Sequence, residues 1–97
     1  PLAFGSDCMP LDPLFGIEQA VTAPEPSQRL TVTEALRAYT YGGAYAAGRE
    51  SELGTLDVGK RADIVVLDES PWEAAGDAVA DIDVARTFVD GDTVYEA

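Results

Sequence analysis

Histidine is absent from this 97-residue sequence, and cysteine occurs once. Without histidine, the sequence lacks both the commonest metal ligand and the side chain that exchanges protons most readily near neutral pH. The lone Cys8 excludes a disulfide within the chain, and it has no histidine partner to activate it as a nucleophile. A phosphate-binding glycine loop of the P-loop or dinucleotide type is also missing. The residues of this chain alone therefore offer little catalytic chemistry.

Basic residues are scarce, with 6 Lys and Arg against 18 Asp and Glu and a formal net charge of −12. Nucleic acid is excluded as a partner because phosphate binding needs a basic surface, and an anionic membrane surface is disfavoured for the same reason. The acidic residues are spread along the whole chain, which is typical of a surface adapted to high salt. An ordinary acidic mesophilic protein is the alternative, and we favour the halophilic interpretation.

Long apolar runs are missing too, since none approaches the roughly 20 residues that span a bilayer. No signal-peptide pattern occurs at the start. We therefore expect a soluble protein, and the unpaired Cys8 indicates a reducing cytoplasm. The sequence starts at Pro1 without a methionine, as an excised segment would. An apolar fraction of 46% predicts one modest core in a single domain.

The first half of the chain carries helix signals. Residues 2–4 read as the end of a short buried strand that runs into a turn. Asp12-Pro13 is typical of an N-cap followed by proline at the first helical position, and Pro24 stops the helix that it opens. Thr31 and Glu34 have the spacing of a capping box at the start of a second helix.

Glycines and periodicity divide the rest of the chain. Gly42 and Gly43 are expected to kink the second helix, and Gly48 suits a helix C-terminal cap. Beyond a seam near residues 48 to 53 the pattern becomes extended. It predicts a strand at 53–56 and a second at 62–67, of which residues 64–67 are expected to be buried on both faces. After a loop or irregular helix at 70–81, two more strands at 84–89 and 93–95 are predicted to flank an Asp90-Gly91 turn. The fold class predicted is α+β.

Asp7 is the one residue placed as a catalytic group would be, at the end of a strand and before a turn. A carboxylate there could ligate a divalent metal and accept a proton from metal-bound water. The alternative is an aspartate that caps the turn, which position alone favours. Glu34 is explained by helix capping. The aromatic residues are interpreted as packing groups, namely Phe15, Tyr39, Tyr41, Tyr45, Trp72 and Phe88.

Two stretches resemble a known family. Residues 54–68, which read Gly-Thr-Leu-Asp-Val-Gly-Lys-Arg-Ala-Asp-Ile-Val-Val-Leu-Asp, resemble a signature near the C-terminus of the amidohydrolase superfamily. Residues 5–17 and 36–40 are similar to the final barrel strand and following helices of the branch that includes N-substituted formamide deformylases. The hairpin at 84–95 is similar to the terminal hairpin of that family.

The resemblance implies a fold and a site. Residues 1–48 would be the last β/α unit of a (β/α)8 barrel, and residues 49–97 the C-terminal part of an accessory β-sandwich. Asp7 matches the family's aspartate that ends the eighth strand, binds metal and takes the proton of the hydrolytic water, consistent with active sites at strand C-termini. Asp63 matches a structural Ala-Asp pair. The parent protein would use a divalent metal, with zinc expected, to hydrolyse a small amide, formamide or cyclic amide.

The departures from the family pattern limit this expectation. The family's histidine pair and its further ligands lie upstream of the matched region, and Cys8-Met9-Pro10 replaces the usual Trp-Pro after the aspartate. One carboxylate does not hold a catalytic metal. We therefore expect the isolated segment to be inactive without the remainder of the barrel. The alternative is a non-catalytic acidic module that self-associates through an exposed apolar face.

Overall fold

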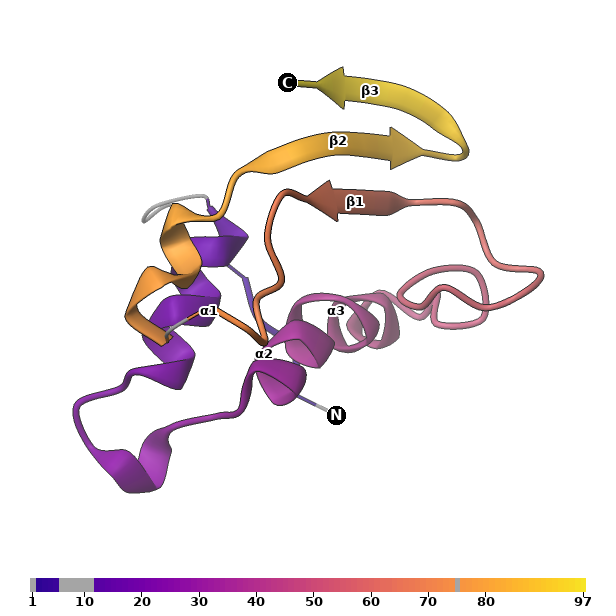
Figure 1. The fold of residues 1–97 in the computed structure, drawn as a ribbon. Coiled ribbons are helices and arrows are strands. Elements are labelled where there is room, and N and C mark those ends of the chain that lie inside the picture. The colour runs from indigo at the N-terminus through magenta and orange to yellow at the C-terminus, as the bar shows by residue number, and fades with distance from the viewer. Residues whose placement is uncertain (1, 6–11, 75) are drawn as a thin grey trace.

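The computed structural model describes residues 2–5, 12–74 and 76–97. Its elements are α1 (Pro13–Val21), the 3-10 helix η1 (Pro26–Gln28), α2 (Val32–Tyr39), α3 (Tyr41–Ala46), β1 (Ile64–Leu67), the 3-10 helix η2 (Gly76–Asp81), β2 (Val84–Val89) and β3 (Asp92–Glu96). Figure 1 shows the helices gathered on one side and the three strands side by side on the other. This is an α+β arrangement, as the sequence predicts.

Both predicted helix starts are confirmed by their caps. The side chain of Asp12 accepts a hydrogen bond from the Leu14 N–H at 3.0 Å, and Pro13 opens α1. At α2 the Glu34 N–H donates to Thr31 Oγ1 at 3.1 Å, and the Thr31 N–H donates to Glu34 Oε1 at 2.9 Å. These bonds satisfy backbone donors that a helix N-terminus otherwise leaves without partners.

The break between α2 and α3 lies at Thr40, which has φ −108° and ψ −85°, and not at the glycine pair. Gly42 and Gly43 are both inside α3, so the predicted kink comes before them. The predicted end at Gly48 is confirmed. Gly48 has φ +72°, and the following N–H of Arg49 donates to the Ala44 carbonyl at 2.8 Å, as in a glycine-terminated helix.

The sheet is antiparallel with strand order β1-β2-β3. Ile64 pairs with Phe88 across the first ladder, and Thr87 pairs with Tyr95 across the second. Asp90 and Gly91 link β2 to β3 with φ +51° and +81°. Two consecutive residues of positive φ fit the twist of a two-residue hairpin, so the predicted Asp90-Gly91 turn is confirmed.

Two strand predictions for the second half of the chain are wrong. Residues 53–56 form bends and no strand, because Gly54 has φ +99° and turns the backbone out of the extended region. The residues of β1 are not buried on both faces, since Val65 is 53% exposed and Val66 is 43% exposed. Within the described residues β1 has a neighbour on one edge only.

The aromatic predictions are also only partly right. Tyr45 is 47% exposed and Trp72 is 61% exposed. The Trp72 indole N–H donates to Thr33 Oγ1 at 2.9 Å, which ties the segment after β1 to the first turn of α2. Both rings therefore lie at the surface of the described chain, whereas Phe88 and Tyr39 are half-buried.

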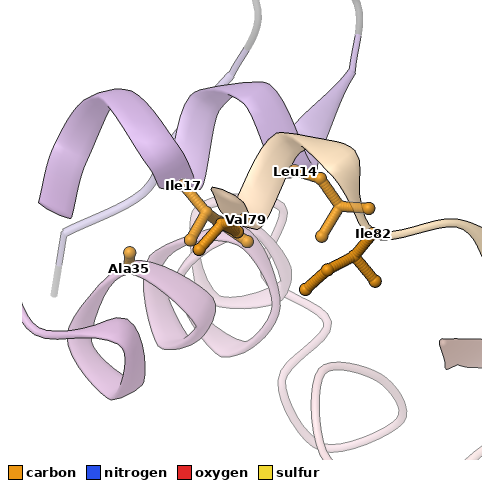
Figure 2. Packing of buried hydrophobic residues seen from close by; sticks show 5 residues of the cluster. All are labelled: Leu14, Ile17, Ala35, Val79 and Ile82. Atoms are coloured by element: carbon orange, nitrogen blue, oxygen red, sulfur yellow. The ribbon is translucent and has the colours of Figure 1, made fainter. Parts of the chain in front are cut away.

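The buried core lies among the helices and not beneath the sheet. It consists of Leu14, Ile17, Ala35, Val79 and Ile82, from α1, α2 and the η2 region. Figure 2 shows these side chains meeting between the helices, with Ile17 against Val79 and Leu14 facing Ile82. Within the described residues this small cluster corresponds to the modest core that the composition predicts.

Polar contacts fasten η2 and the sheet to this core. Glu18 Oε1 on α1 accepts a hydrogen bond from the Ala80 N–H at 3.1 Å. Where β1 ends, the Asp68 N–H donates to the Asp83 carbonyl at 3.0 Å, and the Asp83 N–H donates to Asp68 Oδ1 at 3.1 Å. The sheet therefore joins the helical part at one end, next to the buried residues. No helix within the described ranges is long and apolar enough to cross a membrane.

Candidate functional site

Asp7, the predicted metal ligand and general base, lies outside the described residues. The structure does describe both flanks, which are residues 2–5 before it and Asp12 after it. Asp12 is the N-cap of α1. The candidate site is therefore characterised by what holds these two flanks.

Residues 2–5 run along the helices without forming a strand. The Phe4 N–H donates to the Ala38 carbonyl of α2 at 3.1 Å. The Phe4 ring meets the Tyr39 ring edge-on, with centroids 5.3 Å apart and planes at 72°. Such edge-to-face pairs add roughly 1 kcal/mol beyond the apolar area they bury. The predicted buried strand at 2–4 is therefore wrong: no strand ladder forms on these residues within the described part of the chain, and Leu2 is 57% exposed, although Phe4 anchors the segment to α2.

Two glycines allow this close packing. A Cβ on Gly42 would overlap the Leu2 carbonyl oxygen, and a Cβ on Gly16 would overlap the hydroxyl of Tyr39. The segment before Asp7 therefore rests on α3 at Gly42, and the ring that it packs against rests on α1 at Gly16. Only glycine leaves room for backbone and ring to approach this closely.

Asp63 is held in a structural role at the start of β1. Its Oδ2 accepts a hydrogen bond from Arg61 Nη2 at 2.8 Å, and its Oδ1 accepts one from the Asp90 N–H at 2.8 Å. The Arg61 hydrogen bond, followed by that from the Asp90 backbone, lowers the pKa of Asp63 below 3.8. A carboxylate stabilised in this way is a poor proton acceptor at neutral pH. This agrees with the structural role that the sequence resemblance gives to Asp63.

Glu34 is likewise a capping residue. The hydrogen bond from the Thr31 backbone, followed by that from its side chain, lowers the pKa of Glu34 below 4.5. Its carboxylate is used by the N-terminus of α2, as the sequence predicts. The pKa of Glu52 is also lowered, because its carboxylate accepts a hydrogen bond from Arg49.

A groove of about 460 Å3 lies between α3, the bend at 53–56 and the start of β1. Asp63 is the one side chain of its lining that is charged at neutral pH, and that carboxylate already accepts hydrogen bonds from Arg61 and from the Asp90 backbone. The rest of the lining is alkyl, aromatic, hydroxyl or glycine, including Ala44 and Leu53. The groove therefore lacks the acid and base pair that hydrolysis requires.

The described residues do not form a metal centre. Within 2–5, 12–74 and 76–97, no three acidic, histidine or cysteine residues lie together as a metal-binding group. A hydrolytic zinc site uses about three protein ligands and an open position for water. The described residues therefore supply no ready set of ligands for such a site.

Comparison with known families and proteins gives matches over most of the chain. Residues 1–95 match the pattern described as Amidohydrolase family. The N-substituted formamide deformylase of Arthrobacter pascens is 46% identical over 72 residues, which are 74% of this chain and 13% of that protein. The probable imidazolonepropionase of Homo sapiens is 35% identical over 72 residues, 74% of this chain and 17% of that protein.

Solved structures match the fold. An amidohydrolase from Thermotoga maritima MSB8 has a TM-score of 0.68 at 29% identity, over 92% of this chain and 21% of that one. An adenosine deaminase from Xanthomonas campestris with bound zinc has a TM-score of 0.68 at 26% identity, over 89% of this chain and 23% of that one. The chain thus spans less than a quarter of each of these four relatives.

Proposed function

Because the chain belongs to the amidohydrolase family, we propose that it forms part of a metal-dependent hydrolase of carbon–nitrogen bonds other than peptide bonds. The observation that carries the proposal is the family match over residues 1–95, together with 46% identity to a formamide deformylase. The substrate class proposed is a small amide, formamide or cyclic amide. The cytoplasm is the proposed location, in a cell with a high internal salt concentration.

We assign the two halves of the chain to two parts of a larger fold. Residues 1–48 would be the last β/α unit of a (β/α)8 barrel, and residues 49–97 the C-terminal part of a β-sandwich. The three α-helices end before residue 48 and the three strands begin at residue 64, which supports this assignment, although η2 of the second half packs against the helices of the first. So does the exposure of Val65 and Tyr95, because a sandwich sheet needs a second layer over its apolar face.

Asp7 is the proposed metal ligand and general base, and the remaining ligands would come from polypeptide outside these residues. The anchored segment that precedes it supports this role, since a catalytic carboxylate must be held in place. Zinc is the proposed metal, because the related adenosine deaminase structure carries bound zinc. When bound, such a metal supplies an acidified water at neutral pH.

The test compares the 97-residue chain with the complete polypeptide encoded by the reading frame that contains it. The probes are formanilide, acetanilide and hydantoin, one for each substrate class. The complete polypeptide should bind a divalent metal and hydrolyse at least one of the three, whereas the 97-residue chain should do neither. Turnover by the purified 97-residue chain with stoichiometric zinc would contradict the proposal.

A matched pair of variants tests the role of Asp7 in the complete polypeptide. Asp7→Asn should abolish turnover, because the amide is neither an anionic ligand nor a base. Asp12→Asn should leave turnover unchanged, since asparagine caps a helix as well as aspartate does. Equal activity of the two variants would remove Asp7 from the mechanism.

An alternative function is a non-catalytic interaction or dimerisation module. The observation that favours it is the set of exposed apolar side chains on the sheet, namely Val65, Val66, Val89, Val94 and Tyr95. Self-association through one face of the sheet would cover the part of this set that includes Val65 and Tyr95, which lie on the same face across Thr87. Analytical ultracentrifugation in high salt tests this alternative, because screening reduces repulsion between chains of charge −12. A monomer at all concentrations counts against the module.

A further inference from the structure

We propose that Asp90-Gly91 is a site of spontaneous aspartate isomerisation, and that contacts of the turn with Ala62 and Asp63 suppress the reaction while the hairpin is folded. The product is isoaspartate, in which the main chain runs through the side-chain carbonyl carbon of Asp90. The proposal concerns the described hairpin, and it does not depend on the proposed hydrolase function.

The reaction needs only these two residues and water. The backbone nitrogen of Gly91 attacks the carboxyl carbon of Asp90 in its protonated form. An N–C bond forms and the C–OH bond breaks, so the hydroxyl leaves as water together with the amide proton. The resulting succinimide ring then adds one water. Addition at the side-chain carbonyl restores aspartate, and addition at the main-chain carbonyl gives isoaspartate, so the overall step is an isomerisation without oxidant or reductant.

The sequence distinguishes this pair from the other acidic positions. Asp90-Gly91 is the single Asp-Gly pair of the chain, and asparagine, whose side chain can form the same ring, is absent. Glycine has no Cβ to hinder the approach of its own nitrogen to the carboxyl carbon. Both residues are exposed in the turn at the end of β2 that lies away from η2 (Figure 1), so water reaches them.

Two backbone hydrogen bonds of the folded turn oppose the attack. The Gly91 N–H, whose proton must leave the nitrogen, donates to the Ala62 carbonyl at 2.9 Å. The Asp90 N–H donates to Asp63 Oδ1 at 2.8 Å. Arg61 orients that carboxylate, because its Nε and Nη2 donate to Asp63 at 2.9 and 2.8 Å. The nitrogen therefore reacts when the turn opens locally, and the rate follows the population of the open turn.

The product does not fit the hairpin. Isoaspartate adds a methylene group to the main chain of a two-residue connection whose φ angles are +51° and +81°. The register that pairs Val89 with Asp92 depends on the length of this connection. Isomerisation therefore weakens the pairing of β3, an exposed strand, with β2.

The experiment incubates the complete polypeptide at neutral pH, folded in buffer and unfolded in guanidinium chloride. Isoaspartate at position 90 is followed by proteolysis, liquid chromatography and fragment-ion mass spectrometry. The isomer has the mass of the unmodified peptide but a different retention time, and the ring intermediate is lighter by one water. We expect isomerisation in the unfolded wild type, at a rate at least about tenfold higher than in the folded wild type.

Variants separate the contacts of the turn from general stability. Asp63→Ala should raise the rate in the folded protein on the order of tenfold, because it removes a hydrogen bond to a charged group. Thr31→Ala removes the cap of α2, so it should lower the unfolding midpoint and leave the rate unchanged. If Asp63→Ala does not fold, Arg61→Ala loosens the same carboxylate and should raise the rate in its place.

Absence of isoaspartate at position 90 in the unfolded wild type overturns the proposed site. Equal rates in the folded and unfolded wild type overturn the suppression by the folded turn. So do equal rates in folded Asp63→Ala and the folded wild type, or a rise in Thr31→Ala as large as that in Asp63→Ala. Where Asp63→Ala does not fold, an unchanged rate in Arg61→Ala overturns it as well. Each of these results leaves the proposed hydrolase intact.

Discussion

Asp63 Oδ1 accepts a hydrogen bond from the backbone N–H of Asp90, 2.8 Å away and 27 positions later in the chain. Asp90 is the first residue of the β2–β3 turn and has φ +51°, and the next N–H, that of Gly91, donates to the Ala62 carbonyl at 2.9 Å. The Ala62-Asp63 pair thus binds two successive amides of the hairpin turn. This gives a physical reason for an aspartate before β1, independent of any catalytic role, whereas Ala62 contributes only its backbone carbonyl.

Removal of the Asp63 carboxylate should release the turn. In Asp63→Ala we expect faster hydrogen exchange of the Asp90 and Gly91 amides and a lower thermal unfolding midpoint. Asp92→Ala is the matched control, because it removes an acidic side chain at the other end of the same turn, where no bond to a backbone amide is found in the described chain. Equal exchange rates in the two variants would show that the Asp63 bond does not hold the turn.

The capping box should make stability depend on pH. Glu34 has a pKa lowered below 4.5 in the folded chain, so it contributes stability above that pH and loses it as the pH falls through the lower folded value. In Glu34→Gln the cap bond is kept but no longer titrates. Urea unfolding between about pH 7 and 3 should therefore show that the free energy of unfolding falls less below pH 4.5 in Glu34→Gln than in the wild type. The same pH dependence of the free energy of unfolding in both proteins would contradict this.

Two glycines of positive φ should respond differently to alanine. Gly54 has φ +99° and Gly59 has φ +91°, so both substitutions cost backbone strain of about 1 kcal/mol. A Cβ on Gly54 would also lie 2.9 Å from the Ala44 Cβ, whereas one on Gly59 would meet nothing within 4 Å. Gly54→Ala should therefore lower the free energy of unfolding by more than Gly59→Ala does, in denaturant titrations. The reverse order would contradict the packing of the 53–56 bend on α3.

Salt should stabilise the chain. A net charge of −12 on 97 residues makes the folded state repel itself, and salt screens this repulsion over roughly 10 Å at 0.1 M. We expect the unfolding midpoint to rise steadily from low salt to molar potassium chloride, as the halophilic interpretation requires. A midpoint that is unchanged or falls would favour an ordinary acidic protein.

The elements that the sequence predicts well are those determined by near neighbours. The Asp12 cap, the capping box at Thr31 and the Asp90-Gly91 turn each depend on residues within about three positions. The failures depend on distant packing or on one unusual dihedral angle. Exposure of Val65 depends on which layers cover the sheet, and Gly54 ends the predicted strand at 53–56 through its positive φ.

The candidate site was predictable only through resemblance. Position alone favours a turn-capping role for Asp7, since aspartate is common in turns. The glycine contact that anchors the preceding segment could not be foreseen, because Gly42 reads as a helix interruption in the sequence. Only the close approach of the Leu2 carbonyl gives that glycine a second explanation.

Because the core lies among the helices, the helical part and the sheet should differ in their stability against local unfolding. The sheet joins the helical part through the paired backbone of Asp68 and Asp83, next to Leu67 and Val84, while β3 is exposed along its length. Apart from the contact of Val84 with the core, the hairpin is held by ladder bonds and by the exposed turn bonds to Ala62 and Asp63, and such exposed bonds open before buried helices do. The C-terminal hairpin can therefore unfold locally and re-form its strand pairing while the Ile17 cluster stays packed. A polypeptide that contains this hairpin can accordingly form these strands late in folding.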